Sequence, residues 1–300
     1  MTHPRLRSLA VVSVLMAAMQ GAAQSRIDCG AVNSRILKHS VRYCVYLPPS
    51  YAAGGANHSS QDFPVLYFLH GLGGNEQTVL ENGGWTMLDD LWRRHKIREF
   101  ILVAPDGGQT FYINSADGAV RYSDFFLQEF VPFVEARHRI AKGRDNRGIS
   151  GVSMGGYGAL RFAFSHPEIF GAVSAESAAL ITQSPQEIDA SISSGSSPII
   201  KVLTDVFGDP INPVHWRENN PFALARNNAQ DLHRLAIYFN CGQDDSYGFE
   251  KGAAALHGEL RKEGVKHEYR SYPGDHSVEY FLAHFEEVVE FHSKAFRPAP

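Results

Sequence analysis

The sequence predicts an α/β fold in which a mainly parallel central sheet carries helices on both faces. Residues 63–70 (FPVLYFLH) and 100–104 (FILVA) are continuous apolar runs, which are typical of strands buried on both faces. Segments in which apolar residues recur at helical spacing separate the predicted strands. Strands that alternate with helices along a chain predict such a layered α/β architecture.

The first 23 residues are predicted to be a secretory signal peptide. Arg5 and Arg7 give a positively charged start, residues 9–19 form a short apolar run, and small residues follow it. A membrane-spanning helix is the alternative, but the run is shorter than the roughly 20 apolar residues that a span needs. We therefore expect a chain of residues 24–300 that is secreted or periplasmic, without stable membrane insertion.

Composition limits the classes of function. The 300 residues are 44% hydrophobic and 20% charged, with a net charge of −4, which is ordinary for a globular protein. Such mild acidity provides no basic surface for nucleic acid and no polybasic segment for a membrane. The chain has no repeat, linker or change of composition, so residues 24–300 are predicted to form one domain. Its oligomeric state is left open.

Each element of the first half follows from a local pattern. Residues 41–47 alternate and are rich in β-forming side chains, and two prolines end this strand. A polar loop leads to the buried strand 63–70. Helical spacing of apolar residues predicts one helix over 85–98, before the strand 100–104, and another over 125–138.

In the second half, a short strand at 147–150 enters a glycine-rich turn, a helix follows at 157–165, and a strand at 170–175. Residues 180–225 then break the rhythm, because they are polar and rich in serine and proline. We interpret them as a lid-like insertion, since so long an excursion inside a compact domain more often serves binding than surface filling. The remaining predicted elements are strands at 235–241 and 267–272 and helices at 252–263 and 278–295.

A glycine-framed serine is the first functional candidate. Gly151-Val152-Ser153-Met154-Gly155 has the form G-x-S-x-G, the signature of a nucleophile elbow between a strand and a helix. Glycines are needed there because so tight a turn leaves little room for side chains. An ordinary Gly/Ser loop is the alternative on the motif alone. The predicted strand before it and helix after it favour the elbow, with Ser153 as nucleophile.

A base and an acid follow Ser153 in the order Ser, Asp, His that such a hydrolase requires. His276 lies between the last predicted strand and the last helix, and of the 14 histidines it alone has that position. A surface histidine is the alternative. After the strand 235–241, Asp244 and Asp245 offer two carboxylates, one of which would orient the imidazole. We favour Asp245, and Asp244 stays open.

Two backbone N–H groups are needed to stabilise the oxyanion of an acyl-transfer intermediate. One is predicted to come from Met154, directly after the nucleophile. The other is predicted to come from the glycine-rich turn at residues 70–74, from Leu72. His70 is interpreted as a structural residue that supports this turn rather than as a second base.

The three cysteines suit an exported protein. Cys29 and Cys44 flank a predicted hairpin, and export permits a disulfide between them. Two unpaired thiols are the alternative. Cys241 lies in an apolar strand and is interpreted as a buried, inert thiol. No matching histidine spacing accompanies the cysteines, so the sequence predicts no metal site.

Several stretches make the chain resemble the esterase D-type branch of the α/β hydrolases, which includes feruloyl and acetyl-xylan esterases, S-formylglutathione hydrolases and mycolyltransferases. The resemblance runs from about residue 40 to 290, nearly the whole mature chain. Its motifs are YLPPSY at 46–51, LHGLGG at 69–74, PDGG at 105–108, GVSMGG at 151–156, GQDD at 242–245 and GDH at 274–276.

The resemblance implies an α/β-hydrolase fold and several residue roles. It places the acid at Asp245, the last position of the family's G-x-x-D turn, and the second oxyanion amide at Leu72. It matches Trp85 to a tryptophan that follows the glycine turn in many members. It also places Tyr112, within residues 111–114, in a segment near the active-site cleft. Trp85 and Tyr112 are therefore predicted to contact the substrate, and no cofactor is implied.

The predicted function is that of an exported serine carboxylesterase with an acyl-serine intermediate. The implied substrates are small-molecule or carbohydrate-linked esters with short-chain or aromatic acyl groups, of the acetyl and feruloyl kinds. One alternative is an acyltransferase that uses the same triad with a sugar hydroxyl in place of water. Another is a secreted binding protein on a disabled hydrolase scaffold, against which the complete Ser, Asp and His series argues.

Overall fold

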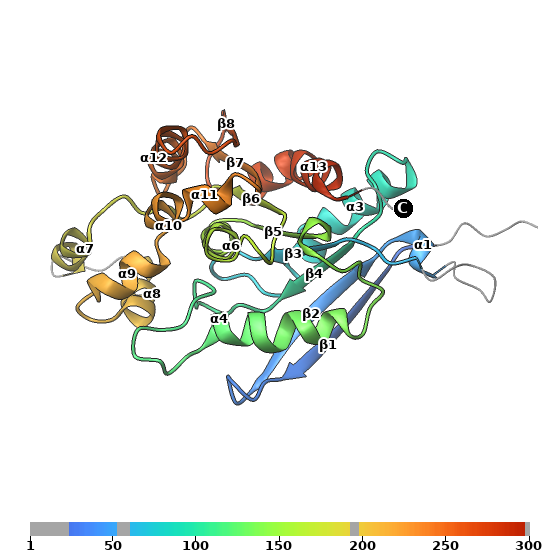
Figure 1. Ribbon diagram of the computed structural model, residues 1–300, viewed down its shortest axis with the longest axis horizontal. Helices are drawn as coiled ribbons and strands as arrows, with labels where there is room; N and C mark the ends of the chain where they lie inside the picture. Colours follow the sequence, from blue (N-terminus) through green and yellow to red (C-terminus); the bar gives the residue numbers. More distant parts are fainter. Residues whose placement is uncertain (1–23, 53–60, 193–197, 298–300) are drawn as a thin grey trace, which may run out of the picture.

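The computed structural model describes residues 24–52, 61–192 and 198–297, so the predicted signal peptide, residues 1–23, lies outside the described residues. The strands are β1 (Arg26–Asn33), β2 (Ser40–Leu47), β3 (Val65–Leu69), β4 (Ile101–Pro105), β5 (Arg147–Gly151), β6 (Ala172–Glu176), β7 (Ala236–Gly242) and β8 (Glu268–Tyr272). They form one sheet in the order β1-β2-β4-β3-β5-β6-β7-β8 (Figure 1). β2 is antiparallel to both of its neighbours, and all other neighbouring strands are parallel. The predicted mainly parallel sheet is confirmed.

Helices cover both faces of this sheet. α3 (Gly84–Arg93) and α13 (Val278–Ala295) contact each other on one side, whereas α6 (Met154–Ser165) and α12 (Phe249–Lys262) cover the other. Within the described ranges, no helix has both the length and the apolar character that a bilayer span needs. The other helices are α1 (Pro49–Ala52), α2 (Thr78–Glu81), α4 (Tyr122–Phe125), α5 (Val131–Glu135), α7 (Pro185–Ile192), α8 (Pro198–Phe207), α9 (Pro213–Asn219), α10 (Pro221–Asn227) and α11 (Ala229–Leu232), with a π-helix at Phe126–Phe130 and a 3-10 turn at Arg144–Asn146.

Helix ends differ from the predicted ranges where the backbone turns sharply. The helix predicted over residues 85–98 ends at Arg93, because His95 adopts a left-handed backbone with a φ of 53°. The helix predicted from residue 157 begins at Met154, since the turn at Ser153 leads directly into it. The last helix has the predicted bounds, 278–295.

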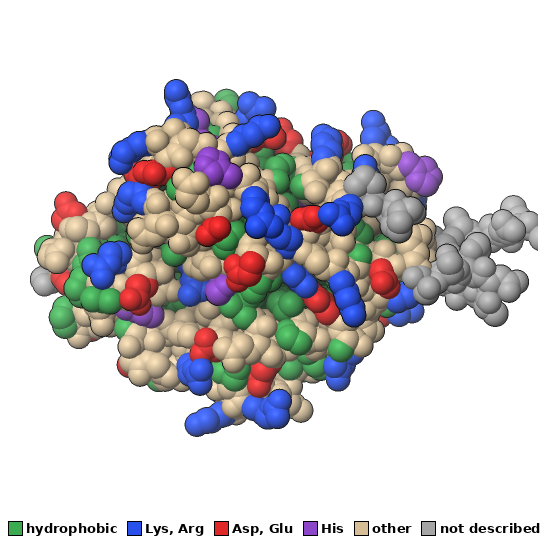
Figure 2. All heavy atoms as spheres, in the orientation of Figure 1, with side chains coloured by type: hydrophobic (Ala, Val, Ile, Leu, Met, Phe, Trp, Pro, Cys, Tyr) green, Lys and Arg blue, Asp and Glu red, His purple; other side chains and the backbone are tan. Residues whose placement is uncertain are grey.

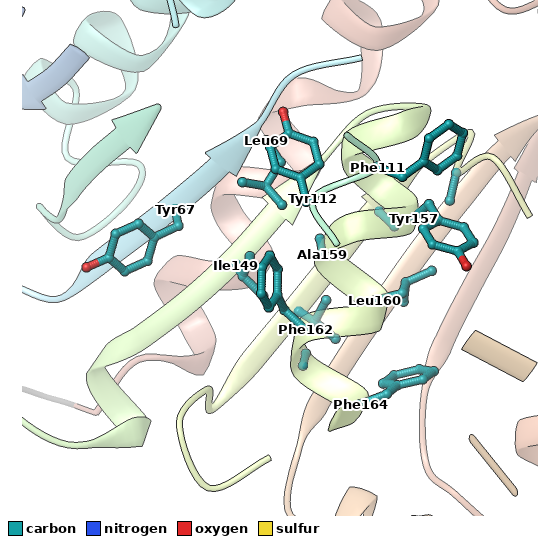
Figure 3. Packing of buried hydrophobic residues seen from close by; sticks show 14 of the residues in the cluster. Tyr67, Leu69, Phe111, Tyr112, Ile149, Tyr157, Ala159, Leu160, Phe162 and Phe164 are labelled. Atoms are coloured by element: carbon teal, nitrogen blue, oxygen red, sulfur yellow. The ribbon is translucent and has the colours of Figure 1, made fainter. Parts of the chain in front are cut away.

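Two apolar clusters lie between the sheet and its helices. On the α6 side, Tyr67 of β3 belongs to one cluster with Leu160 and Phe162 of α6 (Figure 3). On the opposite side, Phe68 of β3 belongs to a smaller cluster with Phe285 of α13. Successive strand residues point to opposite faces, so a strand with an unbroken apolar sequence contributes to both clusters.

The segment predicted as an insertion, residues 180–225, is helical and packs onto α6. Its helices α7 to α10 lie at one end of the molecule (Figure 1), and α10 contacts both α6 and α12. The Tyr157 hydroxyl of α6 donates to the Asn219 carbonyl oxygen at 2.8 Å, and Arg161 donates to the Asn219 side chain at 3.0 Å. The insertion is therefore fixed to the helix that begins beside Ser153.

Both edge strands of the sheet carry charged side chains. On β1, Arg26 lies 3.0 Å from Asp28, and on β8 both Glu268 and Arg270 are exposed. Basic and acidic side chains are also interspersed over the face seen in Figure 2. This face therefore presents no broad region of one charge.

Candidate active site

Four loops at one edge of the sheet bring the candidate residues together. The turn at residues 70–74 follows β3, Ser153 follows β5, Asp245 follows β7 and His276 follows β8. These strands are all parallel, so their carboxyl ends lie at the same edge of the sheet. The fold thus gathers side chains that are far apart in the sequence.

Ser153 lies on a strained turn. Its φ is 55°, in the left-handed region that residues other than glycine rarely adopt. A Cβ added at Gly155 would overlap the Leu69 carbonyl group, and one at Gly151 would overlap the backbone of Gly155. The Ser153 N–H donates to the Glu176 carbonyl oxygen at 2.9 Å, which ties the turn to the end of β6. Close packing therefore requires both glycines of the motif.

His276 joins the serine to a carboxylate. Its Nε2 lies 2.9 Å from the Ser153 Oγ, and its Nδ1 lies 2.7 Å from the Asp245 Oδ2. The tautomer that suits both contacts carries its proton on Nδ1 and donates it to the carboxylate, which leaves Nε2 as an acceptor. This arrangement can move a proton from the serine hydroxyl to the imidazole.

Asp245 is buried but held as an anion. Its Oδ1 accepts hydrogen bonds from the N–H groups of Tyr247 at 3.0 Å and Phe249 at 3.4 Å. Burial, the largest influence, favours the neutral acid. The hydrogen bond and charge of His276, together with the two amides, outweigh it and hold the pKa of Asp245 below its usual value. Asp244, the alternative acid, is exposed, so the partner of His276 is Asp245.

Three aromatic rings surround the His276 imidazole. The ring centroids of Tyr247, Phe249 and Phe281 lie 4.8, 5.4 and 5.3 Å from that of His276, each near edge-on. These contacts fix the plane of the imidazole. Sequence reasoning missed all three, although Tyr247 and Phe249 follow Asp245 by two and four residues, a spacing that could have drawn attention to them.

The turn after β3 lies against the nucleophile. A Cβ added at Gly71 would lie 3.4 Å from the Ser153 Cβ. Among the described residues, neither the Leu72 nor the Met154 N–H donates to a protein acceptor. Met154 begins α6, and the first amides of a helix have no partner within it. Two such amides beside a serine hydroxyl are what an oxyanion hole needs.

His70 links this turn to the next loop. Its Nδ1 lies 2.8 Å from the Gly71 carbonyl oxygen, and its Nε2 accepts a hydrogen bond from the Gly107 N–H at 2.8 Å. The ring is almost fully buried. These contacts agree with a structural role in supporting the turn.

The predicted substrate contact at Tyr112 is wrong. Tyr112 has a φ of 59°, which turns its side chain inward, and the side chain is fully buried. Its hydroxyl donates to the His70 carbonyl oxygen at 3.0 Å. The ring fills space left by glycines, since a Cβ added at Gly158 would lie 2.7 Å from its Cδ2. Tyr112 therefore positions the turn at residues 70–74 from beneath.

Trp85 is partly buried and packs against its neighbours, and its contact with substrate stays a prediction. Its ring lies 5.5 Å from that of Tyr46 and 6.1 Å from that of Trp92, between ring centroids. Both partners belong to the buried cluster on the α3 side of the sheet. The indole therefore packs at the margin of that cluster.

Two of the three cysteines form a disulfide and the third is a free thiol. Cys29 and Cys44 form a disulfide that joins β1 to β2 at directly opposed positions. Cys241 is a free, buried thiol whose pKa burial raises to about 12. In the part of the chain that the structure describes, no group of three or more His, Cys, Asp or Glu side chains is arranged to hold a metal ion.

Comparison with known sequences gives matches over most of the chain. The sequence model of a family described as putative esterase matches residues 34–292. The chain is 27% identical over 236 residues to an acetyl esterase of Caldicellulosiruptor saccharolyticus, a match that covers 78% of this chain and 85% of the relative. It is 26% identical over 246 residues to an esterase of Mycobacterium tuberculosis, covering 77% of this chain and 51% of the relative. The chain thus spans about half the length of the mycobacterial protein.

Solved structures are similar over almost the whole of the described chain. A ferulic acid esterase matches with a TM-score of 0.76 and 25% identity, over 91% of this chain and 99% of that one. An S-formylglutathione hydrolase of Staphylococcus aureus matches with a TM-score of 0.73 and 21% identity, over 90% and 99%. The similarity to the S-formylglutathione hydrolase shows that the two proteins share a fold.

Proposed function

Since the chain belongs to the esterase family and is a carboxylic ester hydrolase of the α/β-hydrolase fold, we propose that it acts through an acyl-serine intermediate on Ser153. The observation that carries this proposal is the hydrogen-bond chain from Ser153 through His276 to Asp245. A serine hydroxyl is a weak nucleophile near neutral pH and needs such a base within hydrogen-bond reach.

In the acylation half of the reaction, His276 takes the proton of Ser153 as the serine Oγ attacks the ester carbonyl carbon. The carbonyl π electrons move onto oxygen, which gives a tetrahedral oxyanion. Asp245 keeps the imidazole in the required tautomer and stabilises its positive charge. The oxyanion then collapses, the bond to the alcohol breaks, and His276 donates its proton to the departing alcohol.

The N–H groups of Leu72 and Met154 would bind the oxyanion. Their lack of protein acceptors and the contact of Gly71 with Ser153 support this assignment. Donors already oriented toward the developing charge stabilise the transition state without reorganisation, and one such donor is typically worth about 10²- to 10³-fold in rate.

In the deacylation half, water takes the place of the alcohol. His276 accepts a proton from this water as its oxygen attacks the acyl-serine, and a second oxyanion forms in the same hole. Collapse releases the carboxylic acid and returns the proton to Ser153. Ser153 supplies the nucleophile, His276 moves the protons and two amides bind the oxyanion, so no step of the proposed reaction uses a metal or an organic cofactor.

We infer that the acyl group is short or aromatic, of the acetyl or feruloyl kind. The acetyl esterase and ferulic acid esterase that the chain resembles support this class. Exposed apolar side chains also lie on the loops that carry the site and at the start of α13: Leu72 is 36% exposed, Tyr247 59% and Val278 42%. An apolar rim suits an acyl chain better than a charged one.

We also propose that the protein works outside the cytosol. The Cys29–Cys44 disulfide supports this, because cytosolic thiols are kept reduced. The predicted cleavage after residue 23 implies a mature chain that begins at Gln24. Intact-mass measurement of the protein recovered outside the cytosol tests it, and a mass that includes residues 1–23 would contradict it.

The test of mechanism uses p-nitrophenyl acetate with wild-type protein and the Ser153→Ala variant. We expect kcat to fall by about 10⁴-fold or more, because the nucleophile is lost. Thermal unfolding should stay close to that of the wild type, since the serine hydroxyl makes its hydrogen bond only within the site. A rate within tenfold of the wild type would exclude Ser153 as nucleophile.

Adjacent aspartates supply a matched control. Asp245→Asn removes the charge beside the imidazole and favours the wrong tautomer, so we expect kcat to fall by roughly 10³- to 10⁴-fold. Asp244→Asn should stay near the wild-type rate, and equal losses would contradict the assignment of the acid. Product analysis with added sugar separates hydrolysis, which releases acetate, from acyl transfer, which yields an acetylated sugar.

A further inference from the structure

A small cavity lies beside the catalytic residues proposed above, on the α3 and α13 side of the sheet. Its volume is about 40 Å³, and the rings of Phe68, Phe281 and Phe285 form much of its wall. A water molecule needs about 10 to 15 Å³ by this kind of measure, so the cavity holds roughly three water-sized groups. A short aliphatic chain fits this space, whereas an aromatic ring is too large for it.

The walls of this cavity come from the segments that carry the site. Val152 directly precedes the nucleophile, and Thr78 follows the turn at residues 70–74. Phe281 lines the cavity and also faces the His276 imidazole, with 5.3 Å between ring centroids. Through Val152 and Phe281 the cavity therefore borders the segments that carry the proposed nucleophile and its base, although neither Ser153 nor His276 lines it.

Glu176 gives this apolar cavity its one carboxyl group. Glu176 is only 1% exposed and is the last residue of β6. Its backbone carbonyl oxygen accepts a hydrogen bond from the Ser153 N–H. The Asn240 side chain hydrogen-bonds the carboxyl group, but its Oε1 has no partner in the described part of the chain. Burial raises the pKa of Glu176 well above its usual value.

A buried oxygen without a partner is unusual in a folded protein, because the lost hydration is not replaced. A neutral carboxyl group can donate one hydrogen bond and accept others. In an apolar cavity whose wall includes the residue before the nucleophile, such a group complements a small chain with a polar atom at its end. It would reject a charged end group, because no lining side chain except those of Thr78, Asn82 and Glu176 is polar and desolvation of the charge would be poorly offset.

We propose that this cavity is the acyl pocket of the enzyme and that Glu176 hydrogen-bonds a hydroxyl carried near the end of a short acyl chain. The inference rests on the proposed acyl-serine mechanism and narrows its substrate class. It assigns Glu176 as a specificity-determining residue, and it favours short hydroxyacyl esters over aliphatic esters of the same length and over aromatic ones.

The experiment compares two isosteric esters, p-nitrophenyl butyrate and p-nitrophenyl 3-hydroxypropionate, in which a hydroxyl replaces the terminal methyl group. For each protein, kcat/KM for the 3-hydroxypropionate ester is divided by kcat/KM for the butyrate ester. This ratio, divided by the corresponding ratio of the uncatalysed hydrolysis rates, is the hydroxyacyl preference. We expect this hydroxyacyl preference to fall at least tenfold in Glu176→Met, because one buried hydrogen bond is typically worth about tenfold. Glu176→Gln keeps a donor and an acceptor and should retain the preference within about threefold.

Glu279→Gln is the matched control, since this acid lies exposed in the first turn of α13. It should leave the preference unchanged. An unchanged preference in a folded Glu176→Met variant would overturn the proposal, and the Glu176 Oε1 would then be satisfied by water alone. Equal losses in Glu176→Met and Glu279→Gln would overturn it too, because the effect would not belong to the cavity.

Should Glu176→Met fail to fold, Leu282→Phe tests the pocket itself. Leu282 lines the cavity on α13, and a larger ring there fills the space. We expect kcat/KM for the butyrate ester to fall at least tenfold relative to acetate, and an unchanged chain-length profile would overturn the proposal. Neither negative result bears on the mechanism, which is judged separately by the loss of acetate hydrolysis in Ser153→Ala.

Discussion

The two faces of the central sheet are packed with different kinds of side chains. On the α6 side, buried aromatic and aliphatic groups dominate, and the ring centroids of Phe126 and Phe162 lie 4.6 Å apart (Figure 3 shows Phe162 among its neighbours). On the α13 side, fully buried polar groups interrupt the core. His292 lies 2.9 Å from the Ser174 hydroxyl, which in turn donates to Ser150 at 2.8 Å.

The two faces of the sheet therefore contribute differently to the stability of the fold and to its reactive groups. Burial of apolar area stabilises a fold roughly in proportion to that area, and the α6 face uses it to hold the helix that begins beside Ser153. Buried polar groups cost stability unless they are paired, and on the α13 face some are not: Glu176 Oε1 and His292 Nδ1 have no partner within the described residues. The α6 side also has unpaired buried oxygens, Glu250 Oε2 and Glu259 Oε1 on α12, but those residues are only half-buried, whereas Glu176 and His292 lie within the core itself.

The largest expected effect is on the apolar face. Phe162→Ala removes a fully buried ring and leaves a cavity, so we expect the free energy of unfolding to fall by about 3 to 5 kcal/mol. Urea denaturation measures this loss. The preference between acyl groups, measured below the unfolding transition, should not change. A changed acyl preference would contradict the division between the two faces.

The second effect is a pH dependence from the α13 face. Burial lowers the pKa of His292 to about 3, against an unfolded value near 6.5. Between these values the unfolded chain binds a proton that the folded chain does not, so the free energy of unfolding falls as pH falls. From pH 7 to pH 4.5 this single group should cost about 2 to 3 kcal/mol.

A His292→Gln variant isolates that contribution, because glutamine does not titrate and still offers a donor to Ser174. Its unfolding free energy should depend less steeply on pH between 7 and 4.5 than that of the wild type. His39→Gln, at an exposed position, is the control and should follow the wild-type curve. Parallel curves for wild type and His292→Gln would show that the buried imidazole takes up its proton without unfolding.

The smallest expected effect tests how tightly the apolar face is packed. A methyl group added at Gly158 would lie 2.7 Å from the Tyr112 ring, whereas one added at Gly258 would meet nothing within 4 Å. We expect Gly158→Ala to destabilise by about 1 to 3 kcal/mol. Gly258→Ala, within the exposed face of α12, should stabilise by about 0.5 to 1 kcal/mol. Equal shifts in melting temperature would contradict this contrast.

The strands and the order of the site residues could be predicted because both follow from local patterns. β3 and β4 are apolar runs with clear ends. The start of α13 is marked by Ser277, whose side chain accepts the Tyr280 N–H at 3.3 Å. Ser153 and His276 stand out because each follows a predicted parallel strand, and such positions converge at one edge of the sheet.

The directions of side chains could not be predicted in the same way. Tyr112 turns inward because of a positive φ at a loop residue that is not glycine, which no sequence pattern marks. Trp85 lies on a helix whose buried face depends on the partner helix α13, some 200 residues later. Glu176 lies directly after the strand predicted at residues 170–175, and only the folded chain places phenylalanines from two distant segments beside it.

The charged edge strands bear on how the protein behaves at high concentration. An edge strand presents unpaired N–H and C=O groups that can pair with a strand of another molecule, and charged side chains oppose such pairing. β1 carries the Arg26 and Asp28 pair, and β8 carries exposed Glu268 and Arg270. Because these charges balance on each strand, they add little net repulsion, yet intermolecular pairing at either edge would require them to lose water. Charged side chains at both ends of the sheet thus oppose edge-to-edge pairing between molecules.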